Sequence, residues 1–402
     1  MDKHTGVPVL RPGEALGEPP NRALLLERYA NNSSPLNTRA FSARERRYHR
    51  RGILWDLSEL ERVCKCGRVV VDARGVGVRR SSSGVVGLTG LTTCGSVWSC
   101  PVCNAKVMSR RAMEIGAAVT AWEASGGSVG FVTLTMRHDK GQHLQMLWDA
   151  LARAWGRVTG GKAWFTDKAL AGVGGWLRVV EVTLGENGWH VHVHALVFLA
   201  GSNNAGGRLQ RLQRSMFGRW SRALVRAGLD APRMIGQEAH IVRGAADKSL
   251  SEYFTKARDD ATYGIGLELA HSQSKIARDG FGTFTPWELL TMLDLADTEE
   301  RFLMARDLWG EWEAGSKGRR QIAWSKGFRD VVGLGVEVED EEIAAEVAGD
   351  ESDTVVYITA AGWASIRRQP SAIGKMLDVL ATGGPGDLGL FLRALQIDYE
   401  EV

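Results

Sequence analysis

Residues 188–200, Gly-Trp-His-Val-His-Val-His-Ala-Leu-Val-Phe-Leu-Ala, carry most of the information in this chain. In this stretch His190, His192 and His194 alternate with hydrophobic residues, so a β-strand would point all three imidazoles from one face. Neutral imidazole is a strong ligand for divalent metals, and histidines two apart on a strand form a compact platform for one. The stretch therefore predicts a metal-binding strand. Three surface histidines on an amphipathic hairpin are the plain alternative.

The residues before this stretch predict its partner strand. Residues 177–184 have strand character, and Gly185-Glu-Asn-Gly188 is typical of a hairpin loop. If the hairpin is symmetric about that loop, Glu181 lies directly opposite His192. Cross-strand Cβ atoms lie roughly 4.5–5.5 Å apart, close enough for a carboxylate to share a metal with imidazoles. The candidate ligands are Glu181, His192 and His194, with His190 as a fourth possibility.

A tyrosine further along the chain is a candidate nucleophile. Residues 247–256 have helical periodicity, and Tyr253 and Lys256 are neighbours on one face. A tyrosine hydroxyl has a pKa near 10 and is a poor nucleophile at neutral pH. An adjacent ammonium group and a nearby divalent cation both favour the phenolate, the form that attacks phosphorus. Taken alone, the pair would be read as a half-buried tyrosine beside a solvated lysine.

The three segments occur in the order of the motifs of a known enzyme family. Phe131-Val-Thr-Leu-Thr135, in a strand before the hairpin, is similar to the first motif of the HUH endonucleases. His190-Val-His-Val-His194 resembles the second motif of that family, and Tyr253-Phe-Thr-Lys256 resembles the third. The chain thus resembles HUH rolling-circle replication initiators (Rep proteins) of actinobacterial plasmids, over roughly residues 60–330.

The resemblance implies an enzyme that nicks single-stranded DNA. His192 and His194 would bind Mn²⁺ or Mg²⁺, and Tyr253 would attack one strand of the plasmid origin, presented single-stranded or as a hairpin beside flanking duplex. The products would be a 5′-phosphotyrosine and a free 3′-hydroxyl that primes a host polymerase, and the strand would later be rejoined. Lys256 would stabilise the phenolate or the transition-state charge. The sequence has no Gly-x-x-x-x-Gly-Lys-Ser/Thr loop, so a host helicase is expected.

Two points qualify the resemblance. Some related initiators carry a glutamate four residues before the tyrosine, where this chain has Ser249. The residue that activates water at termination therefore stays open, with Glu252, Asp247 and Glu181 as candidates. A conjugative relaxase or single-strand transposase would use the same chemistry. A zinc-dependent DNA-binding regulator without catalysis is the alternative from another class, and Tyr253→Phe would leave its activity intact.

The five cysteines all lie between residues 64 and 103. In a cytosolic chain of this size, clustered cysteines favour metal binding over disulfides. We expect a structural zinc site that rigidifies the entry to the catalytic domain, with Cys64 left over or replacing Cys66. The expected ligands are Cys66, Cys94, Cys100 and Cys103. The actinobacterial initiators also display the stretch Trp98-Ser-Cys-Pro-Val-Cys103, as the resemblance adds.

Composition describes an ordinary globular chain with an uneven charge. Of 402 residues, 44% are hydrophobic and 24% charged, which suffices for a buried core. No apolar run is long enough to span a bilayer and the start lacks a signal-peptide core, so we expect a cytoplasmic protein with no membrane partner. The net charge of +3 includes nine acidic residues between Glu337 and Asp353, so the remainder carries +12 and suits a polyanion.

Two basic segments are candidate DNA contacts. A predicted helix from residue 208 to about 227 carries five arginines in one stripe, and the stretch 318–329 mixes basic and aromatic residues, as suits single-stranded DNA. An exposed structural helix and an anchored surface loop are the alternatives. The candidates are Arg208, Arg211, Arg219, Arg222, Arg226, Arg319 and Arg320.

The order of predicted elements, β-α-β-β-α-β-α, indicates an α+β fold. We expect an antiparallel sheet with helices on one face, ferredoxin-like or RRM-like, preceded by the zinc module and followed by a mainly helical region. His240 lies on the last strand and could approach the metal, although a packed histidine is the simpler reading. The expected divisions are a basic, partly disordered arm (1–60), the zinc module (61–105), the HUH endonuclease domain (106–265), a helical extension (266–336), an acidic linker (337–353) and a small helical module (354–402).

Overall fold

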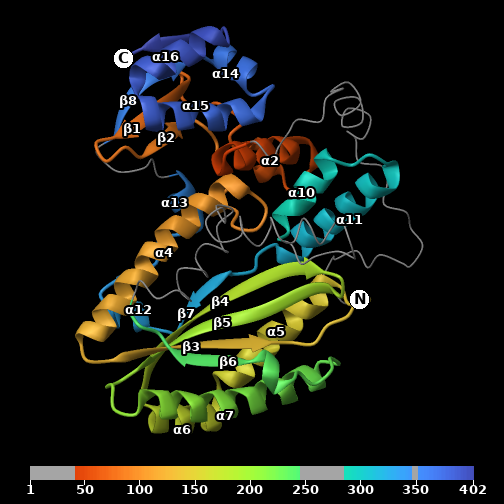
Figure 1. Cartoon of the computed structure of the whole chain (residues 1–402), viewed down its shortest axis with the longest axis vertical. Helices are drawn as coiled ribbons and strands as arrows, with labels where there is room; N and C mark the ends of the chain where they lie inside the picture. Colours follow the sequence, from red (N-terminus) through yellow and green to blue (C-terminus); the bar gives the residue numbers. More distant parts are fainter. Residues whose placement is uncertain (1–40, 245–284, 346–351) are drawn as a thin grey trace, which may run out of the picture. The chain divides into compact units, whose positions relative to one another are not determined.

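The computed structural model describes residues 41–244, 285–345 and 352–402, whose elements carry the labels of Figure 1. The helices are α2 (Ala43–Leu57), α3 (Glu61–Lys65), α4 (Pro101–Ala124), α5 (Leu144–Val158), α6 (Gly161–Ala171), α7 (Ala205–Arg226), α10 (Trp287–Asp294), α11 (Glu299–Ser316), α12 (Phe328–Val331), α13 (Asp340–Ala345), α14 (Ala360–Ile366), α15 (Pro370–Gly383) and α16 (Pro385–Ala394). The strands are β1 (Val76–Ser81), β2 (Val86–Thr89), β3 (Ser128–Thr135), β4 (Val173–Gly185), β5 (Gly188–Leu199), β6 (Glu238–Ile241), β7 (Ile322–Trp324), β8 (Ser352–Ile358) and β9 (Tyr399–Glu401). In these ranges no helix combines the length and apolar character needed to cross a bilayer.

The larger sheet is antiparallel and has the strand order β6-β3-β5-β4-β7. Its first four strands follow the chain order β3-α5-α6-β4-β5-α7-β6, so they form the ferredoxin-like βαββαβ unit that the sequence predicted. β7 then extends the sheet, because Ile322–Trp324 pair with residues 177–179 of β4. The α+β antiparallel class is confirmed.

The β4–β5 hairpin has the register that the sequence predicted. Gly185 pairs with Gly188 at the turn, and Glu181 pairs with His192 eleven residues further on. Gly188 has a φ of +86°, which a side chain would strain, so the tight turn suits a glycine there. Both strands are long, and the alternation of their side chains separates a histidine-bearing face from an apolar one.

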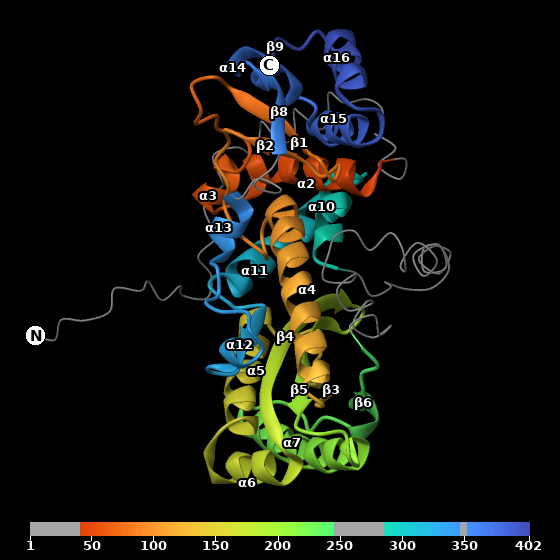
Figure 2. The ribbon, with the colours of Figure 1, turned by 90° about the vertical axis from the view of Figure 1, so that its left-hand side faces the viewer.

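Helices cover both faces of this sheet, which corrects the expectation of helices on one face. α5 and α7 pack against the apolar face, with α6 beside α7 (Figure 1). α4 lies on the histidine-bearing face (Figure 2), where Met108, Ile115 and Val119 join Phe131 and Phe198 in a second core. The physical reason is that the strand ends away from the histidines are apolar on both faces, so both must be covered.

A second sheet, β2-β1-β8-β9, joins two stretches of the chain that the sequence predicted to be separate domains. Val76 and Val78 of β1 are fully buried and pair with Ile358 and Val356 of β8, so the cysteine-rich stretch 61–105 and the stretch 354–402 share one core. Residues 43–57, placed in the expected N-terminal arm, form α2 and pack closely against α15. The last stretch is helical in the middle, with α14, α15 and α16 between β8 and β9.

The first part of the acidic run is folded, which corrects its reading as a linker. Asp340 and Glu337 pair with Arg111 of α4, at 2.8 Å and 3.5 Å. Lys106 Nζ donates a hydrogen bond to the carbonyl oxygen of Ala344 in α13. The acidic side chains therefore neutralise basic groups on α4. Residues 346–351 lie outside the described ranges.

Candidate metal centres and DNA-contacting residues

Three side chains of the β4–β5 hairpin converge on one point. Glu181 Oε2 lies 3.1 Å from Nε2 of both His192 and His194, and the two Nε2 atoms lie 3.0 Å apart. The sequence predicted this group from the strand alternation and the hairpin register. The side chains are 10–21% exposed, so the three atoms face partly out of the protein. We call Glu181, His192 and His194 the triad.

The spacing of the triad suits an octahedral divalent ion. Ligand atoms about 2.1 Å from a metal lie about 3.0 Å apart at adjacent octahedral positions, and about 3.4 Å apart in a tetrahedron. The observed separations of 3.0–3.1 Å match the octahedral value. Two imidazoles and one carboxylate also suit a divalent transition-metal ion by ligand type. The residues present therefore fit a divalent metal ion, as the sequence predicted.

The electrostatics of the triad keep its carboxylate ionised. Burial alone would raise the pKa of Glu181, but hydrogen bonds and charge from His192 and His194 hold it well below its ordinary value. Behind the triad, Thr133 Oγ1 lies 3.0 Å from His194 Nδ1. Thr133 therefore orients the ring, as a hydrogen-bond partner commonly does for a metal-binding histidine.

His190, the fourth candidate ligand, lies outside the triad. Its Nδ1 is 3.3 Å from Nδ1 of His138, and its ring packs against those of His138 and His192. Burial lowers the pKa of His190 to about 4, so this imidazole is neutral at physiological pH. His240 stacks on Phe131 instead of approaching the triad. The alternation of histidines along the strand could not show that His190 has other neighbours.

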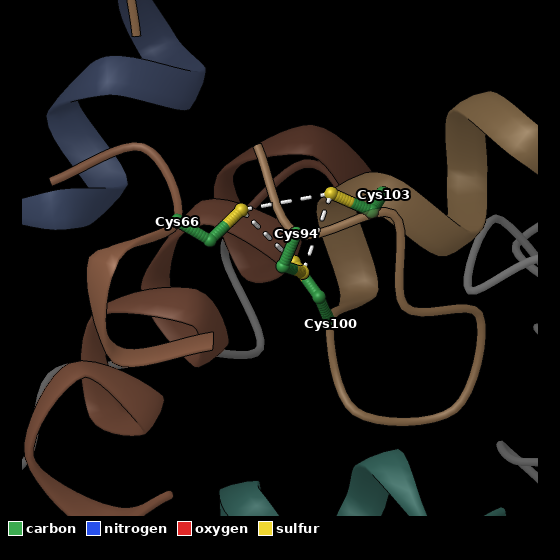
Figure 3. A group of neighbouring side chains, drawn as sticks. All are labelled: Cys66, Cys94, Cys100 and Cys103. Carbon is green, nitrogen blue, oxygen red and sulfur yellow. Dashed lines mark hydrogen bonds between the residues drawn. The ribbon is translucent and has the colours of Figure 1, made fainter. Parts of the chain in front are cut away.

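Four cysteines form a second candidate metal centre, as the sequence predicted (Figure 3). Their sulfur atoms point toward one another, with Sγ–Sγ distances of 3.6 Å and 3.7 Å. Zinc bound by four thiolates at about 2.3 Å requires sulfur separations of about 3.8 Å. Cys64 is excluded, because its thiol donates to the carbonyl oxygen of Ser58. The group is Cys66, Cys94, Cys100 and Cys103, all buried.

A buried cation, Arg51, and a half-buried one, Lys106, lie beside these cysteines. Arg51 is 3% exposed, its guanidinium stacks on Tyr48 at 4.5 Å, and it lies against Gly67, the neighbour of Cys66. Among the described residues, its Nε and Nη2 have no hydrogen-bond partner. Burial lowers the pKa of Lys106, and the nearby cysteines oppose that shift. Uncompensated buried cations are costly, so this environment suits the double negative charge of a zinc–tetrathiolate.

A tryptophan connects the cysteine cluster to the sheet. Trp98, two residues before Cys100, packs edge-on against Trp148 of α5 and Trp312 of α11, at 5.3 Å and 5.4 Å. Trp312 donates to the carbonyl oxygen of Trp98 and stacks on Trp189, the residue before His190. A continuous series of packed tryptophans therefore runs from the cysteine cluster to β5, the strand that carries the two histidines of the triad.

The arginine stripe of α7 divides into two groups. Arg208 donates to the carbonyl oxygens of Ala171, Ala200 and Gly201, and Arg219 pairs with Asp167 of α6. These two arginines stabilise the α6–α7 packing. The other three predicted arginines, Arg211, Arg222 and Arg226, are exposed. Arg214 is also exposed; sequence reasoning missed it, although its helical spacing from Arg211 could have revealed it. α7 packs on the apolar face, so this exposed row lies on the side of the sheet opposite the triad.

The two remaining arginine candidates differ in their surroundings. Arg319 pairs with Asp149 at 2.6 Å and its carbonyl oxygen accepts from Trp98, so it is held within the protein, whereas Arg320 is exposed. Tyr253 and Lys256 lie outside the described residues. Sequence reasoning also missed Thr133, since neither alternation nor spacing marks a residue that orients a ligand from the neighbouring strand, and His138, which contacts His190.

The chain is similar in sequence to known proteins. The Rep_1 model, described as replication protein, matches residues 88–214, a range that includes the triad and three of the four clustered cysteines. Protein rep of Streptomyces lividans is 30% identical over 407 aligned positions, covering 81% of this chain and 87% of that protein. A protein named neomycin resistance protein, from Streptomyces cyanogenus, is 36% identical over 152 positions, covering 32% of this chain and 35% of that protein. No solved structure matches the chain significantly. Because the likeness to Protein rep spans most of both chains, the protein belongs to the Rep_1 family of replication proteins.

Proposed function

We propose that this replication protein initiates rolling-circle replication of a plasmid by nicking one strand of the origin. The observation that carries the proposal is the triad, whose three ligand atoms lie within 3.1 Å of one another. Membership of the Rep_1 family supplies the biological setting. A metal site of this type, used together with a tyrosine nucleophile, suits phosphoryl transfer from a DNA backbone to a side chain.

The residues of the chain would divide the work as follows. Glu181, His192 and His194 hold a divalent ion, and Thr133 fixes the orientation of His194. When bound, the ion supplies positive charge to a non-bridging phosphate oxygen and orients the DNA backbone.

The nucleophile in this proposal is Tyr253. Its phenolate oxygen forms a bond to phosphorus, and the bond from phosphorus to the 3′-oxygen breaks. That oxygen leaves with the electron pair, takes up a proton and becomes the 3′-hydroxyl that primes a host polymerase. Lys256 offsets the negative charge of the phenolate. Because the phosphotyrosine conserves the phosphodiester energy, the strand can be rejoined without another energy source.

The two sides of the sheet suggest how origin DNA is bound. The single strand that contains the scissile phosphate would lie on the triad face. The exposed row of α7, on the other side, would contact phosphates of the flanking duplex. Arg320 would contribute a further phosphate contact. Arg208 and Arg219 are left out of this proposal, because their guanidinium groups are engaged within the protein.

The test is formation of a covalent adduct. The full-length protein is incubated with Mn²⁺ and labelled single-stranded oligonucleotides that tile the DNA around its gene, and denaturing gels are examined for a protein–DNA band. We expect an adduct with one oligonucleotide, and its loss in Tyr253→Phe and in His192→Ala. Tyr263→Phe is the matched control, since it removes the hydroxyl of the next tyrosine along the chain.

Each outcome discriminates between functions. An adduct that is lost in Tyr253→Phe and kept in Tyr263→Phe supports the proposal and maps the nick. An adduct that is lost only in Tyr263→Phe keeps the reaction and assigns the other nucleophile. Folded, metal-loaded protein that forms no adduct on any oligonucleotide would favour the regulator. A relaxase would nick a transfer origin instead of a replication origin. Testing whether the nicked DNA segment maintains a plasmid distinguishes the two.

A further inference from the structure

A short turn beside the triad exposes two large apolar side chains. Met234–Gly236 form a 3-10 turn just before β6, where Ile235 is 94% exposed and Met234 is 41% exposed. Arg233, immediately before them, is also exposed. Single exposed apolar residues are common on protein surfaces and need no explanation by themselves. The rigidity and the position of this turn are the reasons to consider it further.

The turn is held rigidly by one glutamine. Gln237 Oε1 accepts from the backbone amide of Thr135 at 2.9 Å, and Nε2 donates to Thr135 Oγ1 and to the carbonyl oxygen of Arg233. The Thr135 hydroxyl in turn donates to the carbonyl oxygen of Gly236 at 3.2 Å. Trp220 Nε1 donates to the carbonyl oxygen of Thr135, which fixes β3 from the other side of the sheet. Ile235 is therefore presented to solvent on a fixed backbone.

The position of the turn relative to the triad follows from the register. Thr135 pairs with His192 across the β3–β5 boundary, and the turn contacts Thr135 on the β6 side. Two strand spacings of about 4.8 Å place the turn about 10 Å from His192. At about 3.4 Å per nucleotide along a stacked strand, that distance spans about three nucleotides, and fewer if the strand is extended.

We propose that Ile235, supported by Met234, contacts a base of the nicked strand within about three nucleotides of the scissile phosphate. The proposal rests on the proposed function, because it places the scissile phosphate at the triad. An exposed aliphatic side chain on a rigid turn can pack on a base or insert between two bases, as apolar wedges do in other DNA-binding proteins. Arg233 would bind an adjacent phosphate. The turn thus positions the strand, whereas the triad and Tyr253 carry the chemistry.

The experiment is a double-mutant cycle between Ile235 and single bases. In the Tyr253→Phe background, which cannot form the adduct, anisotropy with Mn²⁺ measures the Kd for the oligonucleotide mapped by the nicking assay. Each of the three nucleotides on either side of the nick is replaced in turn by an abasic site. We expect Ile235→Ser to raise Kd about 5- to 10-fold, as loss of a stacked base does. At one position the abasic oligonucleotide should raise Kd similarly, with no further increase when both changes are combined.

Controls separate base contact from loss of structure. Leu170→Ser exchanges another exposed aliphatic side chain, 76% exposed on α6 at the other face of the sheet, and should leave Kd unchanged. Ile235→Leu should keep most of the affinity. Calorimetric Mn²⁺ affinity and thermal stability should be the same in Ile235→Ser as in the parent.

The outcomes distinguish this inference from the proposed function. Adduct formation by the wild-type protein tests the function alone, and the coupling of Ile235 to one base tests the inference. The inference would be overturned if the effects of Ile235→Ser and of the abasic site on Kd were additive at all six positions. A Kd that Ile235→Ser leaves unchanged would also overturn it. A loss of Mn²⁺ affinity or stability in Ile235→Ser would show that the residue is structural. If no oligonucleotide forms an adduct and none binds the protein, both proposals fail together.

Discussion

Thr133 Oγ1 lies 3.0 Å from Nδ1 of His194, on the side of the ring opposite the nitrogen that faces Glu181. The two residues are directly paired across β3 and β5, so the backbone register brings them together. A hydroxyl that accepts from Nδ1 keeps the proton there and leaves Nε2 available as a ligand. β3 thus contributes to the metal site without contributing a ligand.

Thr133→Val should therefore weaken metal binding with little effect on folding. The substitution preserves the branched shape of the side chain and removes only the hydroxyl, so His194 loses its orienting partner. Loss of such partners typically costs 10- to 100-fold in metal affinity, and we expect about 10-fold for Mn²⁺ by calorimetry. Thr183→Val is the matched control, because Thr183 pairs with His190 outside the triad. Equal Mn²⁺ affinity in Thr133→Val and the wild type would contradict this role.

Removing one clustered cysteine should release zinc and destabilise the protein. Cys66→Ser leaves three thiolates, and the buried Arg51 and half-buried Lys106 lose part of their counter-charge. Because structural zinc binding contributes directly to folding, we expect a thermal midpoint lower by many degrees and a zinc content near zero by colorimetric release. Cys64→Ser should retain one zinc, since that thiol donates to a backbone carbonyl outside the cluster. Equal zinc content in both variants would assign the site to other residues.

Much of the triad and of its sheet followed from the sequence, because both depend on local chemistry. The turn at Gly185 and Gly188 sets the register, and the register places Glu181 opposite His192. The cysteine cluster could be chosen because ligand type and number are read directly from the chain.

Other features could not be predicted, because they depend on contacts between residues far apart in sequence. The pairing of Val78 with Val356, which joins the cysteine-rich stretch to the C-terminal strands, has no local signal. The same holds for Arg219, whose helical position suggested a DNA contact until Asp167 of α6 was found beside it. Helical spacing identifies a face of a helix and leaves open which neighbour covers it.

The acid sensitivity of the fold should depend on Glu114 of α4. Burial would raise the pKa of this carboxyl, but a hydrogen bond from Arg329 and the charges of Arg111 and Arg329 hold it below its ordinary value. A carboxyl whose pKa is lower when folded contributes stability that is complete above its unfolded pKa of about 4.3. That contribution is lost as pH falls through the lower, folded value. In measurements from pH 7 to pH 3, the stability should therefore decline as the pH falls below about 4.3.

Glu114→Gln should lower stability at pH 7 and reduce the steepness of that decline. The substitution leaves the buried guanidinium of Arg329 without a carboxylate partner, while Arg111 keeps Asp340 and Glu337, and we expect a cost of about 3 kcal/mol by comparison with other broken buried pairs. Denaturant unfolding at several pH values measures both effects. Glu61→Gln is the control, because its pair with Lys65 is exposed and should contribute nothing measurable. An acid profile identical to that of the wild type would exclude Glu114 as the main source.

Two arginines of α7 should separate DNA binding from stability. Arg222 is exposed on the outer side of the helix, so Arg222→Ala should leave unfolding unchanged and weaken binding to origin duplex at low salt. If it contacts one phosphate, the slope of log K against log salt should fall in magnitude by about 1. Arg219→Ala should affect stability instead of DNA binding, because Arg219 pairs with Asp167 and donates to the carbonyl oxygen of Val158. We expect it to lower the unfolding free energy while the salt slope stays the same. Anisotropy titrations across a salt series, with denaturant unfolding of each variant, distinguish the two. A reduced salt slope in Arg219→Ala would mean that its ion pair opens when DNA binds, and the α6–α7 packing would then belong to the DNA-binding surface.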